Sequence, residues 1–406
     1  MTGPGGDPVA DAYEGPPPTR RPEYWQGGQV APPWGAPGPP PAPWGPQQWA
    51  PQPWPPQPPA QWAPQQWGPQ PWGPPPPPPG VRWAPPPGAP PHDEPRSFLQ
   101  AMRTRDWAWW RPLLGLLLLA VVYLALAVVT AVAGVLGLLA SGVDPGELPD
   151  LAVDQLSDPW VLLFLNASLI VAIPCVWMAW AVAHGMRRGW SSSVLARLRL
   201  RLFLPYTLMA LATLGVGIGL AVLATFTLGE EEVTGPVSSL GWLLVVVLLT
   251  TPLQSAAEEY VFRGYLSQAI AGWIRAPQAG AVLAALLSAL LFAAAHGPQD
   301  PLTFLDRFAF GLAASAVVWL TGGLEAAIVL HAVNNVLVFV LAGTLGEGVA
   351  TEEVPAGIGI GSAVLSLASM AAYVVVVARS RRRLVPETRT AALDLRLPLP
   401  PPVPAR

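Results

Sequence analysis

The feature that most constrains the fold is a series of long apolar stretches that begins near residue 112 and continues almost to the C-terminus. A helix needs about 20 residues to cross the hydrocarbon core of a bilayer, and about eight stretches reach or approach this length. We therefore predict an all-α fold, a polytopic membrane bundle of about eight transmembrane helices. The expected spans lie at residues 112–140, 159–183, 204–228, 237–257, 278–296, 304–321, 324–343 and 357–378.

The charged residues between these stretches predict how the bundle lies in the membrane. Arginine residues gather in alternate loops, on one side of the spans, whereas acidic residues gather in the loops on the opposite side. Because basic residues are retained on the cytoplasmic side, we predict a multi-pass protein of the cell membrane with both termini in the cytoplasm. The arginines flanking the first, second, fourth and eighth spans are Arg103, Arg105, Arg111, Arg187, Arg188, Arg197, Arg199, Arg201, Arg275, Arg379, Arg381, Arg382 and Arg383.

Residues 1–98 have a different composition, rich in Pro, Trp and Gln and poor in Leu, Ile and Val. Proline at this density removes backbone donors and favours an extended, polyproline II chain, so we predict a disordered cytoplasmic tail. The same segment is also compatible with a ligand for proline-recognition domains or with self-association through its tryptophans. We expect a second disordered tail at 385–406, which leaves residues 99–384 as the membrane domain. The net charge of −3 gives no indication of a nucleic-acid partner.

Two adjacent carboxylates lie just beyond the fourth expected span. Glu258 and Glu259 point about 100° apart on a helix, and Glu259 lies four residues before Arg263, the spacing of an ion pair. We interpret Glu258 as a general base and the pair of Glu259 and Arg263 as a brace that holds it. The alternative is that both carboxylates cap the cytoplasmic end of the span and face water.

Two of the four histidines of the chain lie in the same region. His296 precedes Gly297 and Pro298, and a histidine there is often a cap that complements the helix dipole. His331 and Asn335 lie one turn apart within a span, where two directed donors suit a developing oxyanion. A hydrogen bond between neighbouring spans explains the second pair equally well.

Taken together these residues form three motifs: Glu-Glu-x-x-x-Arg at 258–263, Phe-x-x-x-His at 292–296 and His-x-x-x-Asn at 331–335. In this order on successive membrane helices, they resemble the CPBP family of intramembrane proteases. That family includes eukaryotic CAAX-prenyl endopeptidases and bacterial Abi-like proteins linked to bacteriocin processing or immunity. The resemblance covers about residues 235–345 and implies a protease-like core there.

The resemblance implies an intramembrane endopeptidase that hydrolyses a peptide bond near the membrane surface. Glu258 would activate the attacking water with help from His296, and His331 and Asn335 would stabilise the oxyanion. Glu259 and Arg263 would support them. The family is often labelled metalloprotease, and Glu258, His296 and His331 match the kind of ligand set that holds zinc. On the resemblance we favour a mechanism without metal and keep zinc as the alternative.

The expected spans create a difficulty for this site. As full-length helices, the fourth span would place Glu258 at its cytoplasmic end and the fifth would place His296 at its outer end. The two meet only if residues 258–275 continue as a helix within the membrane, or if residues 297–303 dip inward beside a water-filled cavity.

Two other classes of function remain open from the sequence. A non-catalytic binding or bacteriocin-immunity protein would keep the same fold, although it would not need every polar residue. A small transporter or channel would also place polar residues at depth, but the chain lacks an apparent inverted repeat. The substrate, a peptide or protein, is left open by the sequence, as is any partner of the Pro/Trp-rich tail.

Overall fold

The computed structural model describes residues 82–140, 142, 144, 158–228, 235–346 and 356–397. The chain divides into two units, Met1–Trp72 and Gly73–Arg406, and every described residue belongs to the second. Most of the predicted N-terminal tail and the last residues of the predicted C-terminal tail therefore lie outside the described residues.

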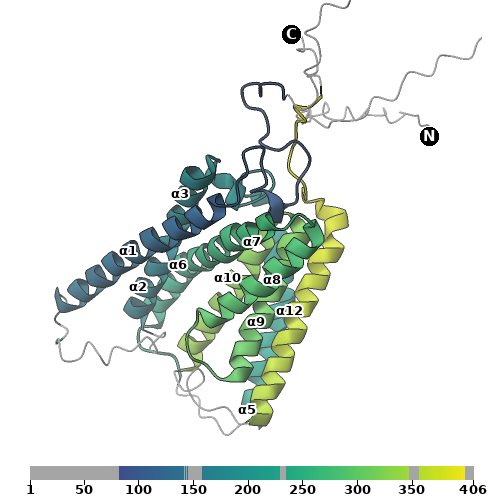
Figure 1. Ribbon diagram of the computed structural model, residues 1–406. Coiled ribbons are helices and arrows are strands. Elements are labelled where there is room, and N and C mark those ends of the chain that lie inside the picture. The colour runs from purple at the N-terminus through teal and green to yellow at the C-terminus, as the bar shows by residue number, and fades with distance from the viewer. Residues whose placement is uncertain are drawn as a thin grey trace, which may run out of the picture. The chain divides into compact units, whose positions relative to one another are not determined.

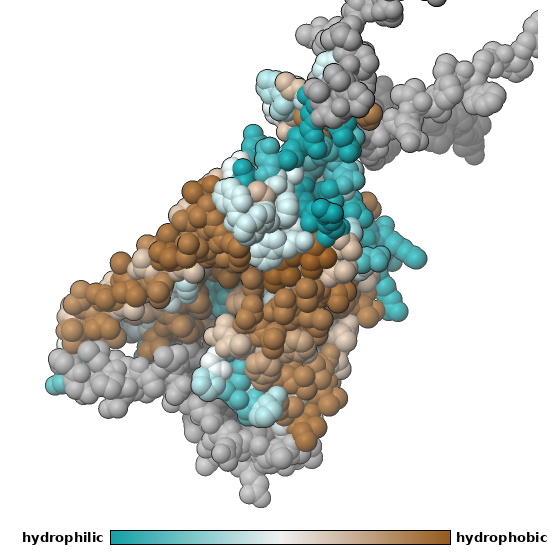
Figure 2. Space-filling view, in the orientation of Figure 1, coloured by the Kyte–Doolittle hydropathy of each residue, from teal (hydrophilic) through white to brown (hydrophobic). Residues whose placement is uncertain are grey.

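The predicted all-α membrane bundle is confirmed. The described residues form eight helical stretches that are long and apolar enough to cross a membrane, and they contain no named β-strand. Figure 1 shows them side by side, and Figure 2 shows an apolar surface that runs along them. The spans are Arg111–Ala140 (α1), Pro159–His184 (α2, Pro159–Ile170, and α3, Ala172–His184), Leu200–Thr227 (α4, Phe203–Ala210, and α5, Val216–Leu228), Leu240–Trp273 (α6, Leu240–Val261, and α7, Ser267–Trp273), Pro277–Ala294 (α8), Pro301–Thr321 (α9), Glu325–Leu345 (α10) and Gly359–Leu384 (within α12, Ala356–Leu384).

The fourth span differs from its prediction, because it does not end at residue 257 but continues as one helix to Trp273. A π-helical turn, Phe262–Leu266, joins α6 to α7. The carbonyl of Phe262 accepts the backbone N–H of Ser267 in this turn, and it also accepts hydrogen bonds from Ser267 Oγ at 2.9 Å and Ser288 Oγ at 3.0 Å. The charged residues that suggested a helix end, Glu258, Glu259 and Arg263, instead find polar partners inside the bundle, so they do not end the helix.

Helices α8 and α9 form a close antiparallel pair that reaches the same depth as α6. Asp300 caps α9, because its Oδ1 accepts from the backbone N–H groups of Leu302 at 2.8 Å and Thr303 at 3.1 Å. Gly311 lets α9 approach α8, since a Cβ atom there would lie 2.8 Å from Cα of Ala289. The sequence between α8 and α9 is therefore a short capped connection.

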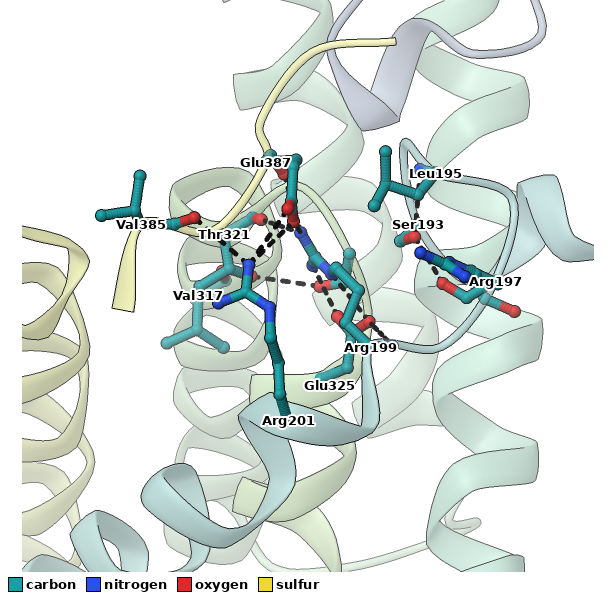
Figure 3. Close-up of polar contacts among 12 residues, drawn as sticks. Ser193, Leu195, Arg197, Arg199, Arg201, Val317, Thr321, Glu325, Val385 and Glu387 are labelled. Atoms are coloured by element: carbon teal, nitrogen blue, oxygen red, sulfur yellow. Dashed lines mark hydrogen bonds and ion pairs between the residues drawn. The ribbon is translucent and has the colours of Figure 1, made fainter. Parts of the chain in front are cut away.

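A buried ion pair fixes the turn between α9 and α10 (Figure 3). Arg199 Nη2 lies 2.6 Å from Glu325 Oε2, and Arg199 Nη1 donates to the carbonyls of Thr321 at 3.0 Å and Glu387 at 2.7 Å. Burial disfavours the Glu387 carboxylate, but its own backbone N–H and the guanidinium groups of Arg201 and Arg199 outweigh burial and lower its pKa. The residues that follow α12 are thereby tied to this turn.

Described residues near the two ends of the membrane domain also pair with each other. The backbone N–H of Trp83 donates to the carbonyl of Leu395 at 2.8 Å, and that of Leu393 donates to the carbonyl of His92 at 2.9 Å. Arg105 Nη2 adds a bond of 2.5 Å to the carbonyl of Leu393. Residues 82–97 and 385–397 thus make defined contacts, although all of them lie in segments that the sequence predicts as disordered tails.

Candidate active site

Glu259 lies at the centre of the polar cluster between α6 and α10. Its Oε1 atom accepts a hydrogen bond of 2.9 Å from Arg263 Nη1 and lies 2.9 Å from Nδ1 of His331. Arg263 Nη2 also donates to the carbonyl of Gly311 on α9, at 3.1 Å. The ion pair that the spacing of Glu259 and Arg263 predicts is therefore present, and it joins three helices.

Glu258 occupies the neighbouring face of α6 and is more accessible than Glu259. Its side chain is 15% exposed, whereas that of Glu259 is fully buried. Its Oε2 atom lies 3.7 Å from Nε2 of His331, and its Oε1 atom accepts a hydrogen bond from Nε2 of Gln254. The two carboxylates thus face opposite sides of one imidazole ring, and of the two only Glu258 is partly exposed.

Asn335 lies one turn beyond His331 on α10 and faces the same group. Its Nδ2 atom lies 3.3 Å from Oε1 of Gln254, and its Oδ1 atom accepts from Nδ2 of Asn334 at 3.2 Å. The structure therefore brings Glu258, His331 and Asn335 together, with Gln254 between the first and the last.

His296 approaches the cluster from the end of α8. Its Nδ1 atom lies 2.8 Å from the carbonyl oxygen of Phe292, so it makes the capping contact that one interpretation of the sequence expects. The Phe292 ring lies between the two histidines, with its centroid 4.9 Å from that of His296 and 5.7 Å from that of His331. His296 is thus close to the other polar residues but is exposed and not hydrogen-bonded to them in the described part of the chain.

The continuation of the fourth span removes the difficulty raised by the sequence. Glu258 lies about four turns before the end of α7, rather than at the end of its span. Of the first arrangement considered above, a helix through residues 258–275 within the membrane, the structure shows the helix itself, which continues as far as Trp273.

Aromatic rings enclose the imidazole of His331. Phe310 of α9 lies 5.1 Å from it between ring centroids, and Phe292 stacks on Phe310 at 5.8 Å. The guanidinium carbon of Arg263 lies 4.7 Å from the centroid of Phe292, which places the cation over the ring. These contacts fix the ring of His331 and separate Glu259 and Arg263 from water.

The residues do not fit the zinc site that was kept as an alternative. A catalytic zinc site needs three protein side chains that converge on one point. Within the described ranges, no group of three or more His, Cys, Asp or Glu side chains is arranged in this way. The assignment of Glu258, His296 and His331 as metal ligands is therefore unsupported, and we derive no step through a metal.

Gln254 and Phe310 are the residues of the cluster that the sequence analysis missed. Gln254 lies four residues before Glu258, the same spacing that identified Glu259 and Arg263, so a search for polar residues one turn apart would have found it. Phe310 carries no such signal, because an aromatic residue in an apolar helix is indistinguishable from ordinary packing.

Comparison with known proteins confirms the resemblance suggested by the motifs. Residues 239–337 match the model of a family described as type II CAAX prenyl endopeptidase Rce1-like. The chain is also similar to the uncharacterised protein YyaK of Bacillus subtilis (strain 168), with 27% identity over 206 residues. That match covers 48% of this chain and 65% of YyaK, which is slightly less than two thirds of the relative. No solved structure matches the chain significantly.

Proposed function

We propose that the chain is an intramembrane endopeptidase, because residues 239–337 match the model of a family described as type II CAAX prenyl endopeptidase Rce1-like. The observation that carries this proposal is the position of Glu258, a partly accessible carboxylate beside a buried histidine within a membrane-spanning helix. Ionisable groups at this depth are costly and usually serve a function.

Glu258 is suited to act as the general base. It would take a proton from a water molecule while the water oxygen attacks the carbonyl carbon of the substrate, giving a tetrahedral intermediate. The same proton would then pass to the departing amine as the peptide bond breaks. His296 is placed to orient the water, because Nδ1–H bonded to the Phe292 carbonyl leaves Nε2 free to accept a hydrogen bond.

His331 and Asn335 are suited to stabilise the oxyanion. Glu259 accepts the proton of His331 Nδ1, so Nε2 is the atom that faces Glu258 and the substrate. Nε2 must carry a proton to act as a donor, so this role would require the doubly protonated ring. The amide of Asn335 supplies the second donor.

The substrate we propose is a peptide segment that reaches the site from the membrane or its surface. The family description points to CAAX prenyl proteins, while leader peptides and the tails of membrane proteins fit the same chemistry. We propose the cell membrane as its location, with both termini in the cytoplasm.

Peptide hydrolysis by the purified, reconstituted protein tests the proposal. Quenched-fluorescent peptides, including a prenylated CAAX peptide, would be offered to the wild type and to Glu258→Gln and His331→Ala variants, with and without chelator. We expect the Glu258→Gln variant to lose at least about 100-fold in kcat.

His184→Ala is a matched control, because His184 is a buried histidine outside the site that bonds to Tyr265. Unchanged turnover in Glu258→Gln would contradict the proposal, and wild-type protein that binds but never cleaves these peptides would favour a binding or immunity protein.

A further inference from the structure

We propose that Gln254 is a positioning residue that couples Glu258 to Asn335 through a one-directional chain of side-chain amides. This inference rests on the proposed function, because it assigns a role within the same site. Gln254 is 6% exposed and lies on α6 one turn before Glu258. Both ends of its amide are engaged, with Nε2 donating to Glu258 and Oε1 accepting from Asn335 across the interface between α6 and α10.

The direction of this hydrogen-bonded chain of amides follows from the chemistry of Glu258, the carboxylate at its end. An ionised carboxylate only accepts hydrogen bonds, so the NH2 group of Gln254 must face Glu258 and its oxygen must face Asn335. Asn335 must in turn present Nδ2 to Gln254, which leaves Oδ1 to accept from Asn334. Each amide therefore has one allowed orientation as long as Glu258 is ionised.

This orientation suits Glu258 to accept a proton and Asn335 to donate a hydrogen bond. The bond from Gln254 is charge-assisted when Glu258 is ionised, and the ionised form is the one that accepts a proton from water. Asn335 uses one N–H on Gln254 and keeps the other for the oxyanion. Without Gln254 the amide of Asn335 would lose one of the two hydrogen bonds that keep its N–H, rather than its oxygen, toward the developing negative charge.

Asn334 takes part in the same chain from the end opposite to Glu258. Its Nδ2 occupies the oxygen of Asn335 at 3.2 Å, which opposes the rotation just described. Asn334 is adjacent to Asn335 and therefore points about 100° away around α10, so its contribution is indirect and passes through the amide of Asn335.

The substitution Gln254→Glu tests the proposal with almost no change in shape. Two carboxylates in contact share one proton, so the acid limb of the kcat/KM profile should move to higher pH by about one to three units. Gln268→Glu is the matched control, since Gln268 is a buried glutamine on the same continuous helix that donates to backbone carbonyls of Trp190 and Gly264. The control should keep the acid limb of the wild type.

A second variant and a second readout keep the test independent of folding and of turnover. Gln254→Met fills the same space without hydrogen bonds, and Glu258 should then titrate at higher pH than in the wild type. Infrared difference spectra can follow the carboxyl band, assigned by its loss in Glu258→Gln, without any substrate. A band that titrates as in the wild type in Gln254→Met would overturn the inference. A shifted band in a protein that cleaves no peptide would support the inference and count against the proposed function.

Discussion

Glu259 Oε1 receives two hydrogen-bond donors, one from Arg263 and one from His331, and the second oxygen of Glu259 has no partner in the described residues. A fully buried carboxylate of this kind is stable only because the opposite charge lies beside it. The same atom therefore holds the imidazole in place and neutralises the buried guanidinium. Removal of its charge should affect both neighbours at once.

We predict that Glu259→Gln will destabilise the protein by about 3–5 kcal/mol, because the amide leaves the buried charge of Arg263 uncompensated. Unfolding of the purified protein in detergent, followed by helical circular dichroism, measures this loss. Glu258→Gln is the control, since its carboxylate is partly exposed and forms no ion pair with an arginine in the described part of the chain. Equal stability of the two variants would contradict the role assigned to Glu259.

The sequence predicted a contact between two side chains only where both side chains lie on one helix. The ion pair of Glu259 and Arg263 followed from their spacing of four residues, and it is present. The contacts of Glu259 with His331 and of Gln254 with Asn335 join different helices, so no local spacing predicts them. The catalytic roles of these residues stay predictions.

Helix α6 and its continuation α7 show why the sequence misplaced an element boundary. Adjacent charges usually mark the end of a membrane span, and this expectation ended the fourth span at residue 257. The structure instead pairs those charges within the bundle and adds a π turn, Phe262–Leu266, whose first carbonyl accepts from two serine hydroxyl groups as well as from the backbone. A boundary set by tertiary contacts in this way is invisible to hydropathy.

The contact between α8 and α9 gives a prediction about a whole element. A Cβ atom at Gly311 would lie 2.8 Å from both Cα and Cβ of Ala289 and 3.2 Å from Nη2 of Arg263. Gly311→Ala should therefore push α9 away from α8 and cost about 1–3 kcal/mol of stability.

The same unfolding assay measures the effect, and Gly219→Ala is its control. Gly219 lies in α5 with no heavy atom within 4 Å of an added Cβ, so alanine there should leave stability unchanged or raise it slightly. If Gly311→Ala is as stable as the control, the two helices are not held at the distance that the structure gives.

The described part of the chain has an apolar band and a hydrophilic end, which carries the described terminal segments (Figure 2). Hydropathy predicted all eight spans of the described chain, because burial in lipid requires long apolar helices and little else. It did not predict that residues 82–97 would pair with residues 385–397. Short irregular segments pair through backbone groups, which every sequence has, so their pairing leaves no sequence signal.

The distribution of arginine predicts the orientation of the molecule in the membrane. If the arginine-rich side is cytoplasmic, the loop before α6 is external and the segment after α12 is internal. The native thiol of Cys175 is buried and lies 3.1 Å from the carbonyl of Val171, so Cys175→Ala provides a background without thiols. In that background, Ser238→Cys should react with a membrane-impermeant maleimide in intact spheroplasts. Ala391→Cys should react only after permeabilisation, because both positions are exposed and differ only in side. The reverse pattern would invert the topology and place the segment that follows α12 outside the cell.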